Sequence, residues 1–110
     1  MRNIAERDWK KLRDMKDDLL QVACGRILDK AAKLVAQRKD TDHKTYRALW
    51  KMLREEDREI ALMFNDVKRS TAFFKLATWY SRGLIDNDVL QQFSAETRES
   101  VLLFSQGWSE

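Results

Sequence analysis

Apolar side chains recur at the spacing of a helical face along nearly the whole chain. The first series steps by three to five residues and predicts one long helix that ends near Gln37: Ile4, Trp9, Leu12, Met15, Leu19, Ala23, Ile27, Ala31 and Leu34. None of the 110 residues is proline, so no position forbids a helix interior. Gly25 lies inside this helix and indicates either a bend or a close helix crossing.

A polar segment, residues 38–45, separates the first helix from a second one. Three residues in it can cap the new helix: Asp40, Thr41 and Asp42. The helical period then continues through Tyr46, Leu49, Trp50, Leu53, Ile60, Ala61 and Phe64. Asn65 or Asp66 ends this helix, or it runs on to Ser81; the pattern leaves both open.

The segment Val67 to Arg82 carries apolar side chains around roughly 220° of a helical wheel, which predicts a helix buried on most sides. Gly83 follows where a helix ends in a left-handed residue. Asp86 is then expected to cap another helix, and Asp88 adds negative charge at its positive end. Asp86 and Asp88 are therefore interpreted as helix punctuation rather than as a calcium loop, which would need further ligands in register.

The last helical series passes through Phe93, Val101, Leu102 and Phe104, with a restart at Ser94 as an alternative. Together these segments predict an all-α fold, a single three- to four-helix bundle with a long first helix that forms one domain over residues 1–110.

A resemblance adds to this prediction. The run AFFKLATWYSRGLIDNDVLQQF, residues 72–93, resembles a segment of a family of small uncharacterised bacterial helical domains, in which an aromatic-rich helix precedes a Gly-Leu/Ile-Ile-Asp turn and a further helix. The similarity covers about residues 67–104. It implies a helical fold and a bacterial origin, and because the family has no established activity it supplies no functional residue.

Catalytic and metal chemistry find little support in the sequence. Cys24 and His43 are the only residues of their types, which excludes a cysteine zinc cluster and the paired histidines of a helical di-metal site. Cys24 is expected to be a buried, unreactive thiol, and the acidic run Glu55 to Glu59 a solvated surface. We therefore expect neither an enzyme nor a cofactor or metal.

Localisation follows from hydropathy and charge. The longest uncharged runs are far shorter than a membrane span requires, and the first residues are charged where an export signal would be apolar. We expect a cytoplasmic protein that does not enter a membrane.

Basic residues step by three and four along the expected second helix and form one stripe, called here the basic stripe: Lys44, Arg47, Lys51, Arg54 and Arg58. The favoured interpretation is a solvated face, helped by pairing of Lys51 with Glu55, and of Arg54 with Asp57 or of Arg58 with its acidic neighbours. The alternatives are a surface for nucleic acid phosphates or for an acidic protein.

The four tryptophans are spread one per expected helix or tail, and we expect them to meet in one core. The wide apolar surface of the third helix and the aromatic side chain near the C-terminus favour self-association, with Phe74, Trp79 and Trp108 as candidate contact residues. The sequence thus favours a protein-interaction or regulatory module that forms a homodimer, with a nucleic-acid-binding accessory protein as the alternative.

Overall fold

The computed structural model describes residues 3–39 and 41–108, with side chains as far as Gln106. Its elements are α1 (Glu6–Ala36), α2 (Asp42–Phe64), a 3-10 turn η1 (Arg69–Thr71), α3 (Ala72–Ser81), α4 (Asn87–Leu90) and α5 (Ala95–Trp108). The described ranges contain no strand, so the predicted all-α fold and its long first helix are confirmed.

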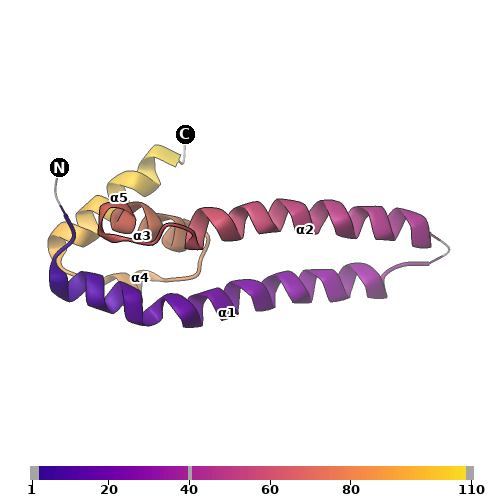
Figure 1. Ribbon diagram of the computed structural model, residues 1–110, viewed down its shortest axis with the longest axis horizontal. Helices are drawn as coiled ribbons and strands as arrows, with labels where there is room; N and C mark the ends of the chain where they lie inside the picture. The colour runs from indigo at the N-terminus through magenta and orange to yellow at the C-terminus, as the bar shows by residue number, and fades with distance from the viewer. Residues whose placement is uncertain (1–2, 40, 109–110) are drawn as a thin grey trace.

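Helices α1 and α2 run antiparallel, side by side, over the half of α1 that leads to the loop joining them (Figure 1). The other half of α1 packs against the block formed by α3, α4 and α5. We call residues 24–39 and 41–57 the arm, because over most of this length α1 and α2 pack only against each other within the described chain (Figure 1). The turn after α3 reaches only the base of the arm, where Arg26 bonds to the carbonyl oxygens of Arg82 and Gly83. The overall extents, 54 × 30 × 24 Å, reflect this projection.

The expected caps of α2 have different outcomes. Thr41 occupies the N-cap position, but its side chain makes no capping hydrogen bond. Asp42 is the first helical residue and places a carboxylate at the positive end of the helix, while Asp40 lies outside the described residues.

At Gly25, a Cβ atom added to the backbone would meet no neighbouring atom within 4 Å, so the interpretation as a close helix crossing is wrong.

The question of whether the second and third helices are continuous is resolved by Asp66. Helix α2 ends at Phe64, and Asp66 adopts a left-handed backbone with φ of 55°, which a continuous α-helix cannot contain. Thr71 Oγ1 donates to the Asp66 carbonyl oxygen at 2.6 Å and holds the turn closed. Helix α3 is therefore a separate element.

Side chains of α3 satisfy the last carbonyl groups of α2, which lack partners within their own helix. Lys75 Nζ donates to the Leu62 carbonyl oxygen at 2.6 Å, and Trp79 Nε1 donates to that of Met63 at 3.0 Å. The Trp79 ring also stacks on Phe64, with centroids 5.7 Å apart. These contacts fix the angle at which α3 leaves α2.

Helix α3 is buried on most sides, as its residue pattern predicts. The main core residues of this region come from all the surrounding elements: Leu12, Phe64, Ala72, Leu76, Ala77, Trp79, Ile85, Leu90, Phe93 and Val101. Burial of such side chains contributes roughly 1.5–3 kcal/mol each, so this block supplies most of the apolar stabilisation.

The predicted helix punctuation is confirmed. Gly83 has φ of 72° and ends α3, and the Leu84 amide reaches back to the Trp79 carbonyl oxygen at 2.8 Å. Asp86 Oδ1 accepts a hydrogen bond from the Val89 amide at 2.9 Å, as an N-cap should. Ser94 separates α4 from α5, which confirms the restart of the last helix.

One buried carboxylate joins the ends of the chain. Asp8 in the first turns of α1 is fully buried and accepts hydrogen bonds from the Ser94 amide at 3.2 Å, Ser94 Oγ at 2.6 Å and Thr97 Oγ1 at 2.7 Å. Burial alone would raise the pKa of Asp8, but the hydrogen bonds from Ser94 and Thr97 outweigh it and hold the pKa below its ordinary value. Asp8 thus caps α5 from another helix.

The Asp86 cap can be tested by Asp86→Ala. The variant loses the bond to the Val89 amide and should reduce the free energy of unfolding by about 1 kcal/mol, measured by urea denaturation. Asp88→Ala removes a neighbouring carboxylate that makes no capping hydrogen bond, and should reduce the free energy of unfolding by only a few tenths of a kcal/mol. Stabilisation of the wild type by calcium that is lost in Asp86→Ala would contradict the capping interpretation.

Asp8→Asn keeps the shape of the side chain but places an amide group among donors, and should reduce the free energy of unfolding by roughly 2–3 kcal/mol at pH 7. Because the folded pKa of Asp8 lies below 3.8, its ordinary value, the carboxylate contributes fully above that pH. The difference between wild type and variant should therefore shrink as the pH falls through the folded pKa. Urea unfolding from about pH 7 to about pH 2.5 measures it, and a difference independent of pH would contradict this role.

Candidate functional site

The α1–α2 layer has a groove on each of its two faces. One groove, the α3 cleft, has a volume of about 720 Å³ and lies where α1, α2 and the end of α3 meet. The other, the arm groove, has a volume of about 450 Å³ and lies between α1 and α2 alone. Ile27 and Ile60 line both grooves and form the wall between them.

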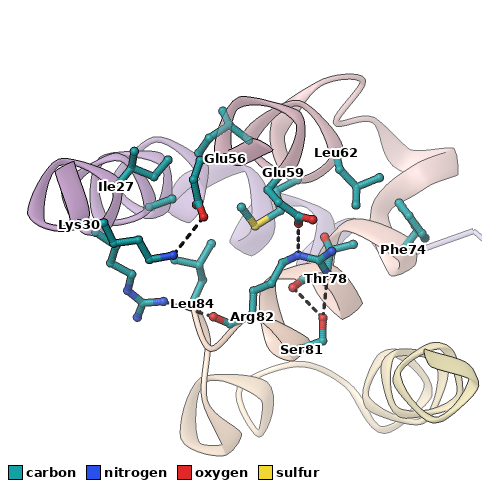
Figure 2. A pocket seen from close by; sticks show the side chains of 14 residues that line it. Ile27, Lys30, Glu56, Glu59, Leu62, Phe74, Thr78, Ser81, Arg82 and Leu84 are labelled. Carbon is teal, nitrogen blue, oxygen red and sulfur yellow. Dashed lines mark hydrogen bonds and ion pairs between the residues drawn. The ribbon is translucent and has the colours of Figure 1, made fainter. Parts of the chain in front are cut away.

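The α3 cleft is bridged by charged side chains that are paired within the chain. Figure 2 shows Lys30 Nζ bound to Glu56 at 3.0 Å, and Arg82 Nε bound to Glu59 at 2.5 Å. Arg26 donates to the carbonyl oxygens of Arg82 at 3.2 Å and Gly83 at 3.0 Å, at the C-terminal end of α3. These contacts tie three helices together, which gives the cleft a structural role.

The cleft lacks the arrangement that nucleophilic catalysis requires. Ser81 Oγ donates to the Thr78 carbonyl oxygen at 3.1 Å and accepts from Arg82, so no base activates it. His43, the only histidine of the sequence, lies exposed in the first turn of α2 on the arm. No group of acidic, histidine or cysteine side chains in the described residues could hold a metal ion.

Lys75 is the one buried cation of the described core. Burial lowers its pKa, whereas the Asp66 carboxylate acts in the opposite direction. Its ammonium group bonds to a backbone carbonyl at the end of α2, and the side chain lines neither groove. The perturbed lysine is explained by helix termination rather than by chemistry on a ligand.

The arm groove opens onto an apolar surface. Five large apolar side chains lie exposed on this side of the arm, and we call them the arm face: Leu28, Val35, Tyr46, Trp50 and Leu53. Leu28 is 66% exposed, Tyr46 60% and Trp50 53%, fractions that a helical bundle normally avoids for such residues. Cys24 lines the same groove and is only half-buried, unlike the buried thiol that the sequence predicts.

Two charged residues complete the arm groove. Arg54 and Asp57 lie one turn apart on α2, and both are exposed. Within the described part of the chain they form no ion pair with each other or with another residue, so the expected pairing of Arg54 with Asp57 is absent. The same holds for Lys51 and Glu55.

Phe74 and Trp79, two of the residues predicted for self-association, do not lie on the arm face. Trp79 is fully buried in the protomer, so its assignment to a contact surface is corrected by its place in the core. Phe74 lines the α3 cleft on the opposite side. Its ring lies edge-on to that of Phe104, with the two ring centroids 6.2 Å apart. The side chain of Trp108 lies outside the described residues.

The tryptophans do not meet in one core, which corrects a further expectation. Trp79 is buried and Trp9 packs partly against the core, but Trp50 is exposed and lines the arm groove between α1 and α2. On this side of the arm, no further segment of the described chain covers an aromatic side chain. The sequence signal for this surface is the spacing of Tyr46, Trp50 and Leu53, which also fits a core helix and so does not reveal where the core ends.

The basic stripe is exposed along its whole length. All five residues lie within roughly 80° of the circumference of α2, and Arg54, at one side of the stripe, also lines the arm groove. In the described structure none of the five takes part in an ion pair, so the stripe consists of solvated cations without intrahelical partners.

No helix within the described residues is long and apolar enough to cross a membrane. Comparison of the chain with protein-family models, with curated proteins and with solved structures finds no match. The resemblance of residues 67–104 to bacterial helical domains therefore stays a prediction, and functional inference depends on the surfaces described above.

Proposed function

We propose that the chain is a non-catalytic helical protein-interaction module that self-associates through the arm face. The observation that carries this proposal is the row of large apolar side chains exposed on one side of a two-helix arm. A helical layer is stabilised when it buries its apolar side against another layer, and here the α3–α5 block does not reach that side.

The exposed area supports an interface of ordinary size. The five side chains of the arm face leave on the order of 400 Å² of apolar surface in water. A stable interface buries about 800 Å² per partner, a little over half of it apolar. The arm face therefore provides the apolar part of such an interface, with Arg54, Asp57 and neighbouring polar groups at its margin.

Nucleic acid binding through the basic stripe is the second candidate. The observation that favours it is the absence of ion pairs along the stripe, within the described chain, since free cations can neutralise phosphates. The stripe lacks a companion recognition element, however, and its cations other than Arg54 lie outside both grooves. We rank this function below self-association.

Self-association can be tested by sedimentation equilibrium and by thermal unfolding at several protein concentrations. We expect a dimer whose melting temperature rises with concentration, because association adds stability to the folded state by mass action. Trp50→Glu should weaken the dimer by about 2 kcal/mol or more, since it places a charge in the apolar interface.

Ala48→Glu is the matched control, because Ala48 is exposed on the same helix but lies about 180° from the centre of the arm face. This variant should dimerise as the wild type does. A wild type that is monomeric at all concentrations, or equal effects of the two substitutions, would refute the proposal.

The second candidate predicts a steep salt dependence. We expect no tight binding of duplex DNA at physiological salt; any binding through the basic stripe must weaken by roughly 0.9 in log affinity per log salt for each phosphate neutralised. Fluorescence anisotropy measures the affinity at several salt concentrations for the wild type and for the double variant that combines Arg47→Glu with Lys51→Glu. Sub-micromolar binding that the double variant loses, with unchanged circular dichroism, would promote nucleic acid binding above self-association.

A further inference from the structure

The arrangement of charges around the arm groove indicates how two copies of the chain meet. This inference rests on the proposed self-association and specifies its geometry. Arg54 and Asp57 lie on either side of the midpoint of the arm groove on α2, have opposite charges and are unpaired within the described chain. Each therefore presents an unsatisfied charge at the margin of an apolar surface.

A twofold axis has a simple consequence for two such residues. In an isologous dimer, every contact occurs twice: if one residue of the first copy contacts a second residue of the partner, then that second residue of the first copy contacts the first residue of the partner. When two identical helices cross antiparallel about a twofold axis, positions equally far before and after the axis face each other. An axis that passes α2 between residues 55 and 56 places Arg54 of each copy opposite Asp57 of the other.

The same axis can be located on α1. Leu28 of α1 lines the arm groove together with both Arg54 and Asp57 of α2, so an axis that passes between these two residues also passes close to Leu28. Leu28, the most exposed side chain of the arm face at 66%, then packs near its own symmetry mate.

Charges further along α1 fit this arrangement. Leu28 stands midway in the sequence between Asp17 and Lys39. An antiparallel crossing at Leu28 therefore brings Lys39 at the tip of one arm to the level of the exposed Asp17 on α1 of the other copy, whereas the neighbouring Arg38 is already paired with Asp42 within the chain at 3.3 Å. The alternative twofold, parallel to the arm, does not bring Asp17 and Lys39 together.

The opposite face of the arm carries the block and cannot take this role. Phe74, Thr78 and Leu84 of the α3 region line the α3 cleft on that side, so α3 and the turn after it already cover part of it. The arm face remains open along the arm. We propose that a second copy of this chain occupies it, antiparallel, with reciprocal Arg54–Asp57 ion pairs flanking a centre at Leu28.

Charge exchange tests this arrangement directly. Arg54→Glu places two carboxylates opposite each other, and Asp57→Arg places two cations opposite each other, twice per dimer in each case. Each variant alone should form a homodimer at least about 10-fold weaker than the wild type, measured by sedimentation equilibrium. Mixed together, the two variants should form a heterodimer within about 3-fold of the wild-type affinity, because both contacts then join opposite charges.

Arg47→Glu is the matched control, with the same change of charge on the same stripe but outside the arm groove. The Arg47→Glu variant should form homodimers with the wild-type affinity and should not form heterodimers with Asp57→Arg in preference to homodimers. Circular dichroism confirms that each exposed substitution leaves the helices intact. Preferential heterodimers of Arg54→Glu with Asp57→Arg, seen by native mass spectrometry, support the proposed pairing.

The outcomes separate the two levels of inference. If the wild type dimerises but the exchanged charges neither weaken the homodimers nor favour the heterodimer, the antiparallel pairing is wrong and self-association stands. If the single variants are weakened and mixing does not restore affinity, the reciprocal pairing is likewise wrong. If the wild type does not dimerise, the proposed function itself fails.

Discussion

The buried carboxylate of Asp8 is the contact on which the arrangement of the helices depends. It accepts hydrogen bonds from Ser94 and Thr97, residues 86 and 89 positions away, and so anchors the start of α5 to the start of α1. A buried carboxylate is tolerated only when donors surround it, and the first turn of α5 supplies them. This places the α3–α5 block against the first half of α1.

Once the block is placed there, the rest of α1 packs mainly against α2, and the turn after α3 reaches only its base, at Arg26. Helix α2 stops at Phe64, where Lys75 and Trp79 take over its last carbonyl groups and turn the chain into the block. The arm is therefore a direct result of where two helices are terminated. Its apolar side chains are exposed because no further segment of the described chain can reach them.

Local signals in the sequence predict much of this fold and little of the candidate site. Gly83 and Asp86 are interpreted correctly because a left-handed glycine and a capping carboxylate act on their immediate neighbours. The spacing of Tyr46 and Trp50 predicts a helix correctly, but spacing reports only that a face is apolar. Whether the face is covered depends on contacts such as that of Asp8 with Ser94, which join distant segments and leave no periodic signal.

The environments of Trp79 and Trp50 are mispredicted for the same reason. The wide apolar face of its helix suggests a surface role for Trp79, yet that width is what a helix at the centre of a block requires. Trp50, for which the sequence suggests a place in the core, is on the surface because the core ends before the arm begins. Long-range packing thus buries one of these two tryptophans and leaves the other exposed.

The division of α1 into two halves has an evolutionary consequence. The first half carries Asp8 and Leu12, which hold the folded block, whereas Leu28 and Val35 in the second half contribute little to it. Substitutions in the second half can therefore alter the proposed self-association while the block keeps its fold. One continuous helix, α1, joins the folded block, whose shape must be kept, to the arm, whose exposed residues are free to change. Because no flexible linker lies between them, the helix fixes the position of the arm relative to the block.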